Sequence, residues 1–160
     1  MTESHIIKLM KDEKQISELG GRSQSHEAAL VAINNHPNET IDVLSKVLGL
    51  SHSGAVRLIN TLEKENLVMR HKSARDARAI VLCTTNAGSE RVQKILDSRE
   101  RVTAQMLKSF DDRQKQDFLR LLKVAMSNLT QEQIEARRIC RLCNEGVCRK
   151  SGCPVENSVK

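Results

Sequence analysis

Residues 40–88 decide the fold of this chain, and they read TIDVLSKVLGLSHSGAVRLINTLEKENLVMRHKSARDARAIVLCTTNAG. Apolar side chains recur at helical spacing in two short segments, Ile41, Leu44, Val47 and Leu48 in the first and Val56, Leu58, Ile59 and Leu62 in the second. Gly49 ends the first segment, and Ser51 is a candidate N-cap for the second. Two short helices joined by a tight turn predict a helix-turn-helix.

The second helix of this pair has a polar face that its apolar core positions leave free. On this face or at its start lie Ser51, His52, Ser53, Arg57 and Asn60, which we predict to contact DNA. In a helix-turn-helix the second helix enters the major groove with its N-terminal residues at the base edges. His52 stands where a side chain meets a phosphate or a base edge, and a solvated histidine is an equal alternative.

A β-hairpin wing is predicted after the second helix. Two β-rich pieces, residues 67–71 and 79–84, flank a polar and basic loop. Arg75, Asp76 and Arg78 of this loop are further candidate DNA contacts. By residue type alone, Asp76 and Arg78 would form a solvated ion pair that contributes little to stability. Their position in a wing beside a helix-turn-helix favours contact with DNA.

These segments, in this order, resemble the MarR family of winged-helix transcription factors. The similar stretches are LSKVLGLS, VRLINTLEKENLVMR, RDAR and LCTTNAG, and the resemblance covers about 120 residues, far more than one short motif. It implies that Arg78 enters the minor groove and that Asp76 holds it there. It also implies a homodimer and a small, often aromatic or phenolic effector bound between the dimerisation and DNA-binding parts.

Helices are predicted on both sides of this unit. Residues 1–20 carry a thin apolar stripe, whereas residues 23–35 are apolar around most of a helix. A long helix should follow Thr85, and Asp111 with Gln114 resembles a capping box for the next one. That last helix carries an apolar stripe of Phe118, Leu121, Leu122, Ala125 and Leu129. The stripe fits an intramolecular core or a dimer interface, and the resemblance favours the dimer.

The composition favours a polyanionic partner, because the 160-residue chain has a formal net charge of +6. Residues 51–80 hold six Lys or Arg against three acidic residues, and residues 137–160 hold six against two. Trp and Tyr are absent and only two Phe are present, which argues against stacking of single-stranded bases on aromatic side chains. We therefore expect double-stranded DNA, read through its grooves, as the partner.

Four cysteines near the C-terminus form a pattern that the MarR resemblance does not cover. Cys140, Cys143, Cys148 and Cys153 have the spacing C-x2-C-x4-C-x4-C, that of a zinc knuckle with cysteine in place of histidine. Four thiolates suit Zn(II) in a tetrahedral site, and Gly146 and Gly152 suit a tight loop. The surrounding basic residues would offset the negative charge of such a site: Arg137, Arg138, Arg141, Arg149 and Lys150.

Other chemistries are open to this tail. An iron–sulfur cluster, a reversible thiol switch that senses oxidants, and a purely structural or interaction module are the alternatives to zinc. The tail, rather than a small effector, would then supply the regulatory signal. The fifth cysteine, Cys83, lies in the second wing strand and is expected to be an ordinary small buried residue.

We expect a mainly α fold with a small β-hairpin wing, that is, a dimeric winged helix-turn-helix. Residues 1–136 would form this domain with its N- and C-terminal dimerisation helices, residues 23–88 its DNA-binding lobe, and residues 137–160 the metal-binding tail. No frame of catalytic residues is recognisable, so we expect a regulator, most simply a repressor of a palindromic operator, and not an enzyme. With no apolar run of about 18 residues, the chain should be cytoplasmic and have no membrane partner.

Overall fold

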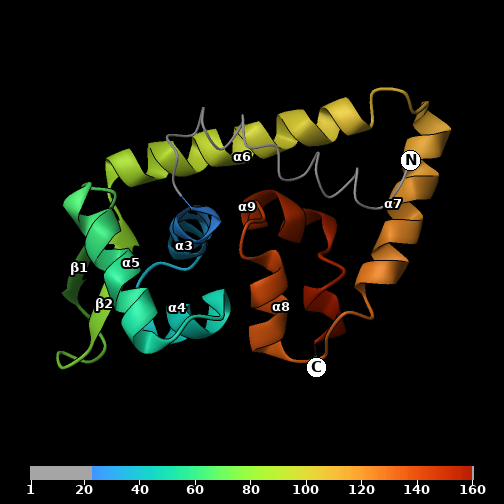
Figure 1. The fold of residues 1–160 in the computed structure, drawn as a ribbon. Coiled ribbons are helices and arrows are strands. Elements are labelled where there is room, and N and C mark those ends of the chain that lie inside the picture. The colour runs from blue at the N-terminus through green and yellow to red at the C-terminus, as the bar shows by residue number, and fades with distance from the viewer. Residues whose placement is uncertain (1–22, 160) are drawn as a thin grey trace.

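The computed structural model describes residues 23–159, which are mainly helical with one small antiparallel sheet (Figure 1). In chain order the elements are α3 (Gln24–Asn35), α4 (Ile41–Leu48), α5 (His52–Lys64), β1 (Val68–Lys72), β2 (Ile80–Thr84), α6 (Asn86–Met106), α7 (Asp112–Met126), α8 (Gln133–Cys140), α9 (Glu145–Cys148) and the 3-10 turns η1 (Arg149–Ser151) and η2 (Glu156–Ser158). The predicted helix over residues 1–20 lies outside the described residues.

The predicted helix-turn-helix is formed by α4 and α5, which pack against each other. Thr40 caps α4, its side-chain oxygen accepting a hydrogen bond from the Val43 amide at 3.4 Å. Gly49 ends the helix in the left-handed region, with φ of 66°. Ser51 caps α5 by accepting from the Gly54 amide at 3.2 Å. The helix limits predicted from the caps are thus confirmed.

The wing is a two-stranded antiparallel hairpin in which Val68 pairs with Thr84 and Lys72 with Ile80. Its strands lie within one residue of the predicted limits. The connection before α4 extends this sheet, because the Leu82 amide donates to the Glu39 carbonyl at 3.0 Å. The wing is therefore joined through main-chain hydrogen bonds to the segment that leads into the helix-turn-helix.

Helix α3 is the centre of the DNA-binding lobe and packs against α4, α6 and β2. Its six consecutive apolar residues, Ala28 to Ile33, are all buried, which confirms the prediction of a helix surrounded by neighbours. Around it lie Leu44 and Val47 of α4, Leu58, Ile59 and Leu62 of α5, Leu67, Val68 and Leu82 of the wing region, and Val92 and Ile95 of α6. One continuous core thus fixes the wing and the helix-turn-helix together.

Helix α6 spans the molecule from the lobe to α7, and the tail lies beneath it between these two parts (Figure 1). Asp111 and Gln114 form the predicted capping box at the start of α7. No residue of α7 is buried within residues 23–159, and Phe118, Leu119, Leu121, Leu122 and Val124 are exposed large apolar side chains. The apolar stripe of α7 is therefore not buried in a core formed by residues 23–159.

The tail has a small core of its own, made of Ala136, Cys140, Cys153 and Val155. Its first helix, α8, packs against α4 of the lobe. Residues 136 and 137, between which the domain boundary was predicted, both lie within α8, so the tail as a packed unit includes the whole helix. Among residues 23–159, no helix combines the length and apolar character needed to cross a membrane.

A close backbone approach at Gly88 gives a first test of this packing. A Cβ at this position would lie 2.0 Å from the main-chain oxygen of Leu67. We expect Gly88→Ala to lower the free energy of unfolding by about 1–3 kcal/mol, because the start of α6 must move away from the wing. Thermal and denaturant unfolding measure this. Gly146→Ala is the control, since its Cβ would meet nothing nearer than 3.5 Å, and an equal effect of both would contradict the packing argument.

Candidate nucleic-acid interface and cysteine cluster

The outward face of α5 carries the predicted major-groove residues. Ser53, Arg57 and Asn60 are exposed, whereas the side chain of Ser51 is engaged in capping the helix. Arg57 forms no side-chain hydrogen bond or ion pair within residues 23–159. The face therefore offers one free guanidinium flanked by short polar side chains, which is a composition suited to base edges and phosphates.

His52 is held by a partner that the sequence did not indicate. Its Nδ1 lies 2.8 Å from Oδ1 of Asp42 in the first turn of α4, and both side chains are largely exposed. This contact links the starts of the two helices of the helix-turn-helix. It also orients the imidazole, so that Nε2 is the ring nitrogen left for an external partner.

Arg70 of β1 connects the wing to α5 and was not among the predicted site residues. One of its guanidinium nitrogens donates to Oδ1 of Asn60 at 2.8 Å, and the other contacts the Glu63 carboxylate. Asn60, predicted to read DNA, thus has its side-chain oxygen engaged with Arg70. The side-chain NH₂ of Asn60 forms no hydrogen bond within residues 23–159. The sequence did not predict this contact, because Asn60 and Arg70 belong to different elements.

The wing loop is shaped by two short side chains. Ser73 Oγ accepts hydrogen bonds from the amides of Arg75 at 3.2 Å and Asp76 at 3.4 Å. Asp76 Oδ1 accepts from the main-chain amide of Arg78 at 3.0 Å. Asp76 therefore orders the backbone that carries Arg78 and forms no ion pair with its guanidinium in this structure. Both arginine side chains are exposed on the loop.

The four tail cysteines lie around one cavity of about 480 Å³. The Cys143 amide donates to the Cys140 carbonyl at 2.7 Å, which closes the C-x-x-C turn at the end of α8. The Cys140 thiol interacts with those of Cys143 and Cys153, and Cys148 interacts with Cys153. All four are free thiols. The fold therefore brings the predicted ligand set together.

These interactions shift the thiol pKa values in opposite directions. A hydrogen bond from Cys140, assisted by the charge of Arg99, lowers the pKa of Cys143 to about 7. The same hydrogen bond, together with burial, raises the pKa of Cys140 far above its usual range. Burial and the neighbouring Cys153 raise the pKa of Cys148 to about 11. Of these three thiols, Cys143 most readily becomes a thiolate.

The side chains are not preset for a metal ion. Within residues 23–159, no three His, Cys, Asp or Glu side chains are arranged to hold one. Gly152, at the end of η1, takes a positive φ of 76°, whereas Gly146 lies inside α9 without one. Only two of the five basic residues, Arg137 and Arg149, line the cavity.

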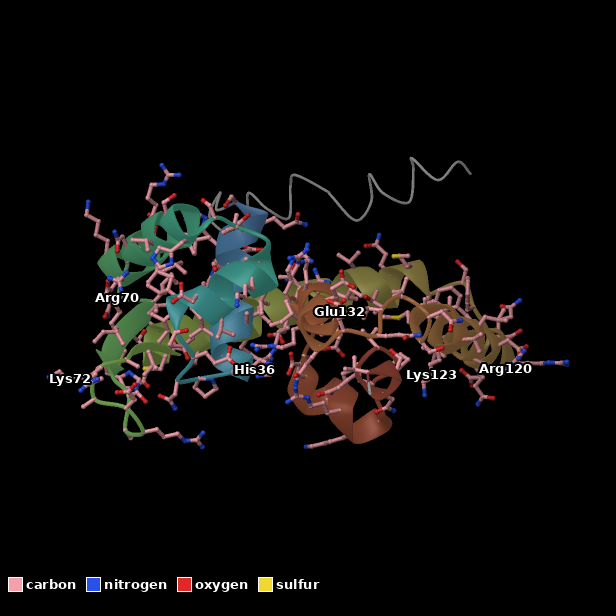
Figure 2. All side chains as sticks on the ribbon, turned by 90° about the horizontal axis from the view of Figure 1, so that it is seen from below. His36, Arg70, Lys72, Arg120, Lys123 and Glu132 are labelled. Carbon is pink, nitrogen blue, oxygen red and sulfur yellow. The ribbon has the colours of Figure 1, made fainter. Side chains whose placement is uncertain are left out.

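Polar contacts fasten the tail to the lobe. Arg137 donates two hydrogen bonds to the Glu39 carboxylate, at 2.9 and 2.6 Å. Asn35 donates to the Cys143 carbonyl at 3.0 Å. His36 lies at the boundary between the two parts (Figure 2), with Nε2 2.9 Å from Oε2 of Glu145. These contacts join α8 and the cysteine loop to the connection between α3 and α4.

Cys83 differs from its predicted environment. It is half-buried instead of fully buried, and its Sγ lies 3.7 Å from Nδ1 of His71 on the paired strand. His71 in turn contacts Oδ1 of Asn38 at 2.8 Å. Cys83 therefore belongs to the wing sheet and is separate from the cysteines of the tail.

Comparison with known proteins agrees with this geometry. Residues 21–79 match the model of the MarR family. The transcriptional repressor MprA of Escherichia coli K12 is 25% identical over 126 residues, which are 78% of this chain and 72% of that protein.

Two solved structures share the fold. YusO of Bacillus subtilis has a TM-score of 0.67 and 18% identity, covering 77% of this chain and 88% of its own. Streptococcus pneumoniae FabT in complex with DNA has a TM-score of 0.62 and 18% identity, covering 76% and 88%. The fold is that of the winged-helix MarR proteins.

The contact between the wing and α5 can be tested at Arg70. Arg70→Ala removes its hydrogen bonds to Asn60 and Glu63, so we expect the free energy of unfolding to fall by about 0.5–1.5 kcal/mol, given that the pair is partly solvated. Amides of β1 should also exchange hydrogen faster. Arg75→Ala is the matched control, because its guanidinium has no partner in residues 23–159. Unchanged exchange in the Arg70 variant would show that the wing is held without this contact.

Proposed function

We propose that this protein is a homodimeric transcriptional regulator of the MarR type, which represses by binding a palindromic operator and is released by a signal. The observation that carries this proposal is the joint presentation of α5 and the wing. Arg57 on the helix and Arg75 and Arg78 on the loop are exposed, and Arg70 ties the two elements together. A helix and an adjacent basic loop of this kind fit a major groove and its flanking backbone or minor groove.

Each exposed group has a distinct role in this proposal. Arg57 and the free amide of Asn60 would contact base edges, since arginine pairs with guanine and asparagine with adenine. Arg78, carried on a backbone that Asp76 orders, would enter the minor groove. Arg75 would neutralise phosphates, and Ser53 and His52 would position the start of α5 against the backbone. The E. coli relative is a repressor and the S. pneumoniae neighbour was solved with DNA, and both support this assignment.

The dimer is proposed from the exposed apolar stripe of α7. Leu121 is 59% exposed and Leu122 is 40% exposed, and neither packs into a core of residues 23–159. Contiguous apolar side chains on a charged helix mark a protein interface. A second copy would also supply the second recognition helix that a palindromic site requires.

A carboxylate placed in this stripe tests the dimer. We expect Leu121→Glu to raise the dimer dissociation constant by at least about 100-fold, because a charge would be buried without a partner. Light scattering coupled to gel filtration, over a range of concentrations, measures the mass. Gln116→Glu introduces the same group on the opposite side of α7 and should leave the dimer intact. A wild-type mass of one chain at every concentration would contradict the proposal.

The wing assignment is tested at Arg78 with duplexes selected by the wild-type protein from random sequences. Arg78→Ala should weaken binding by about 1–3 kcal/mol and reduce the slope of log affinity against log salt by about one. Fluorescence anisotropy across a salt series measures both.

Arg120→Ala is the control for this experiment. Arg120 lies on α7, at the opposite end of the molecule from Arg70 and Lys72 of the wing (Figure 2). The control should bind like the wild type. Equal losses in the two variants would indicate a general charge effect and not entry of the wing into a groove.

A further inference from the structure

The tail is too small to be ordered by apolar burial alone. Its core consists of Ala136, Cys140, Cys153 and Val155, so two of its four buried residues are cysteines. Units of this size usually depend on a disulfide, a metal or docking onto a larger body. The tail does dock, through the packing of α8 on α4, through Leu142 against the lobe core, and through polar contacts with α3 and the connection that follows it. The cysteines are the groups of the tail through which a further ordering element can act.

We infer that Cys140, Cys143, Cys148 and Cys153 bind one Zn(II) ion in a closed, structural site that holds the tail against the helix-turn-helix. The four thiols come from one short segment, residues 140–153, and line one cavity. The C-x-x-C turn already places Cys140 and Cys143 next to each other. Four cysteines without a water position are typical of structural zinc. Cys83, on the wing sheet, takes no part.

The grouping of the four thiols is compatible with the size of a zinc site. With Zn–S bonds of about 2.3 Å, the sulfurs of a tetrahedron are about 3.8 Å apart, which is a separation at which thiols also contact each other. The four thiols line one cavity and affect one another's ionisation. Because no three of them already converge on one point, binding requires rotation about their Cα–Cβ bonds toward the centre of the cavity.

Binding of zinc changes the charge of the cavity. The ion replaces the proton of each of the four thiols, the protons pass to solvent, and no electrons are transferred. The product has a formal charge of −2. Arg137 and Arg149 line the same cavity, and Nε of Arg137 is buried without a hydrogen-bond partner among the described residues. An anionic centre would supply the partner that this N–H group lacks.

The contacts around the cavity extend from the cysteines to the wing. Asn35, at the end of α3, donates to the carbonyl of Cys143 itself. Arg137, one turn before Cys140, is held by the Glu39 carboxylate, while the main chain of Glu39 pairs with Leu82 of β2. Zinc would therefore fix α8 against the segment between α3 and α4, whose residue Glu39 pairs with the wing. The consequence for DNA binding rests on the proposed function, whereas the metal site does not.

The first experiment measures metal in the full-length chain, purified without added metal, by elemental analysis. We expect about one zinc per chain, colourless protein, and cobalt-substituted protein with the absorption bands of tetrahedral thiolate coordination. Cys143→Ser and Cys153→Ser should lower zinc affinity by more than about 100-fold, the upper end of what outer-shell changes cost. Cys83→Ser is the matched control and should retain zinc fully.

A second experiment does not depend on whether the variants fold. Wild-type protein is treated with a chelator and then with zinc, and hydrogen exchange is followed along the chain. Exchange should rise in α8, the cysteine loop and the amide of Leu82, and zinc should restore protection. Affinity for a selected duplex, measured in parallel, should fall and recover.

The outcomes separate the metal site from the proposed DNA function. Iron with sulfide in a brown protein, or thiols that pair as disulfides and bind no metal, would overturn the zinc site. Zinc bound with no change of exchange at α8 and Leu82 would overturn its role in holding the tail. Zinc bound and tail protected, in a chain with no affinity for any duplex, would leave the metal site standing and reject the DNA-binding function instead.

Discussion

The burial of α3 on nearly all sides is the constraint on which the rest of the lobe depends. Ala29, Leu30 and Val31 are fully buried, and burial of a side chain as large as Leu30 or Val31 contributes about 1.5–3 kcal/mol. Because α3 contacts α4, α6 and β2 at once, these elements cannot shift independently. The outward face of α5 and the wing loop are therefore presented as one rigid surface, although their own contacts with each other are few and polar.

The body of α3 and its C-terminal end are held by different kinds of contact. Along its length the helix is held by apolar packing, whereas Asn35 and His36 at its C-terminal end form hydrogen bonds with the tail. Glu39 follows and faces two ways, its main chain toward Leu82 of the wing and its carboxylate toward Arg137 of the tail. Polar contacts of this kind are directional and reversible at low cost, so the junction between lobe and tail is a better place for regulation than the core.

Much of the fold follows from local patterns in the sequence. The caps at Ser51 and Asp111, the stop at Gly49 and the apolar spacing of α5 depend on residues within one or two helical turns of each other, and all are confirmed. The contacts that shape the site join distant positions: His52 with Asp42, Asn60 with Arg70, and Glu39 with Arg137. Hydrophobic periodicity carries no information about such pairs, because it fixes which face of an element is buried but not its polar neighbours. For the same reason the sequence did not predict that Cys83 is half-buried, because its exposure depends on which residues cover the sheet.

The cysteine spacing is the exception, because a local pattern there predicted that the four thiols lie together, and the fold places them around one cavity. A C-x-x-C turn is set by short-range main-chain hydrogen bonding, here from Cys143 to Cys140, while Cys148 and Cys153 return to it through one short helix and one turn. A core of four small or medium side chains gives little free energy to hold such a loop. The tail is joined to the lobe by the packing of α8 on α4 and by ion pairs and hydrogen bonds, which water and salt weaken. The thiols are the groups able to add a strong and chemically switchable constraint. Control of the wing would then begin at the cysteines and pass through Arg137 and Glu39, outside the apolar core that keeps the DNA-binding surface rigid.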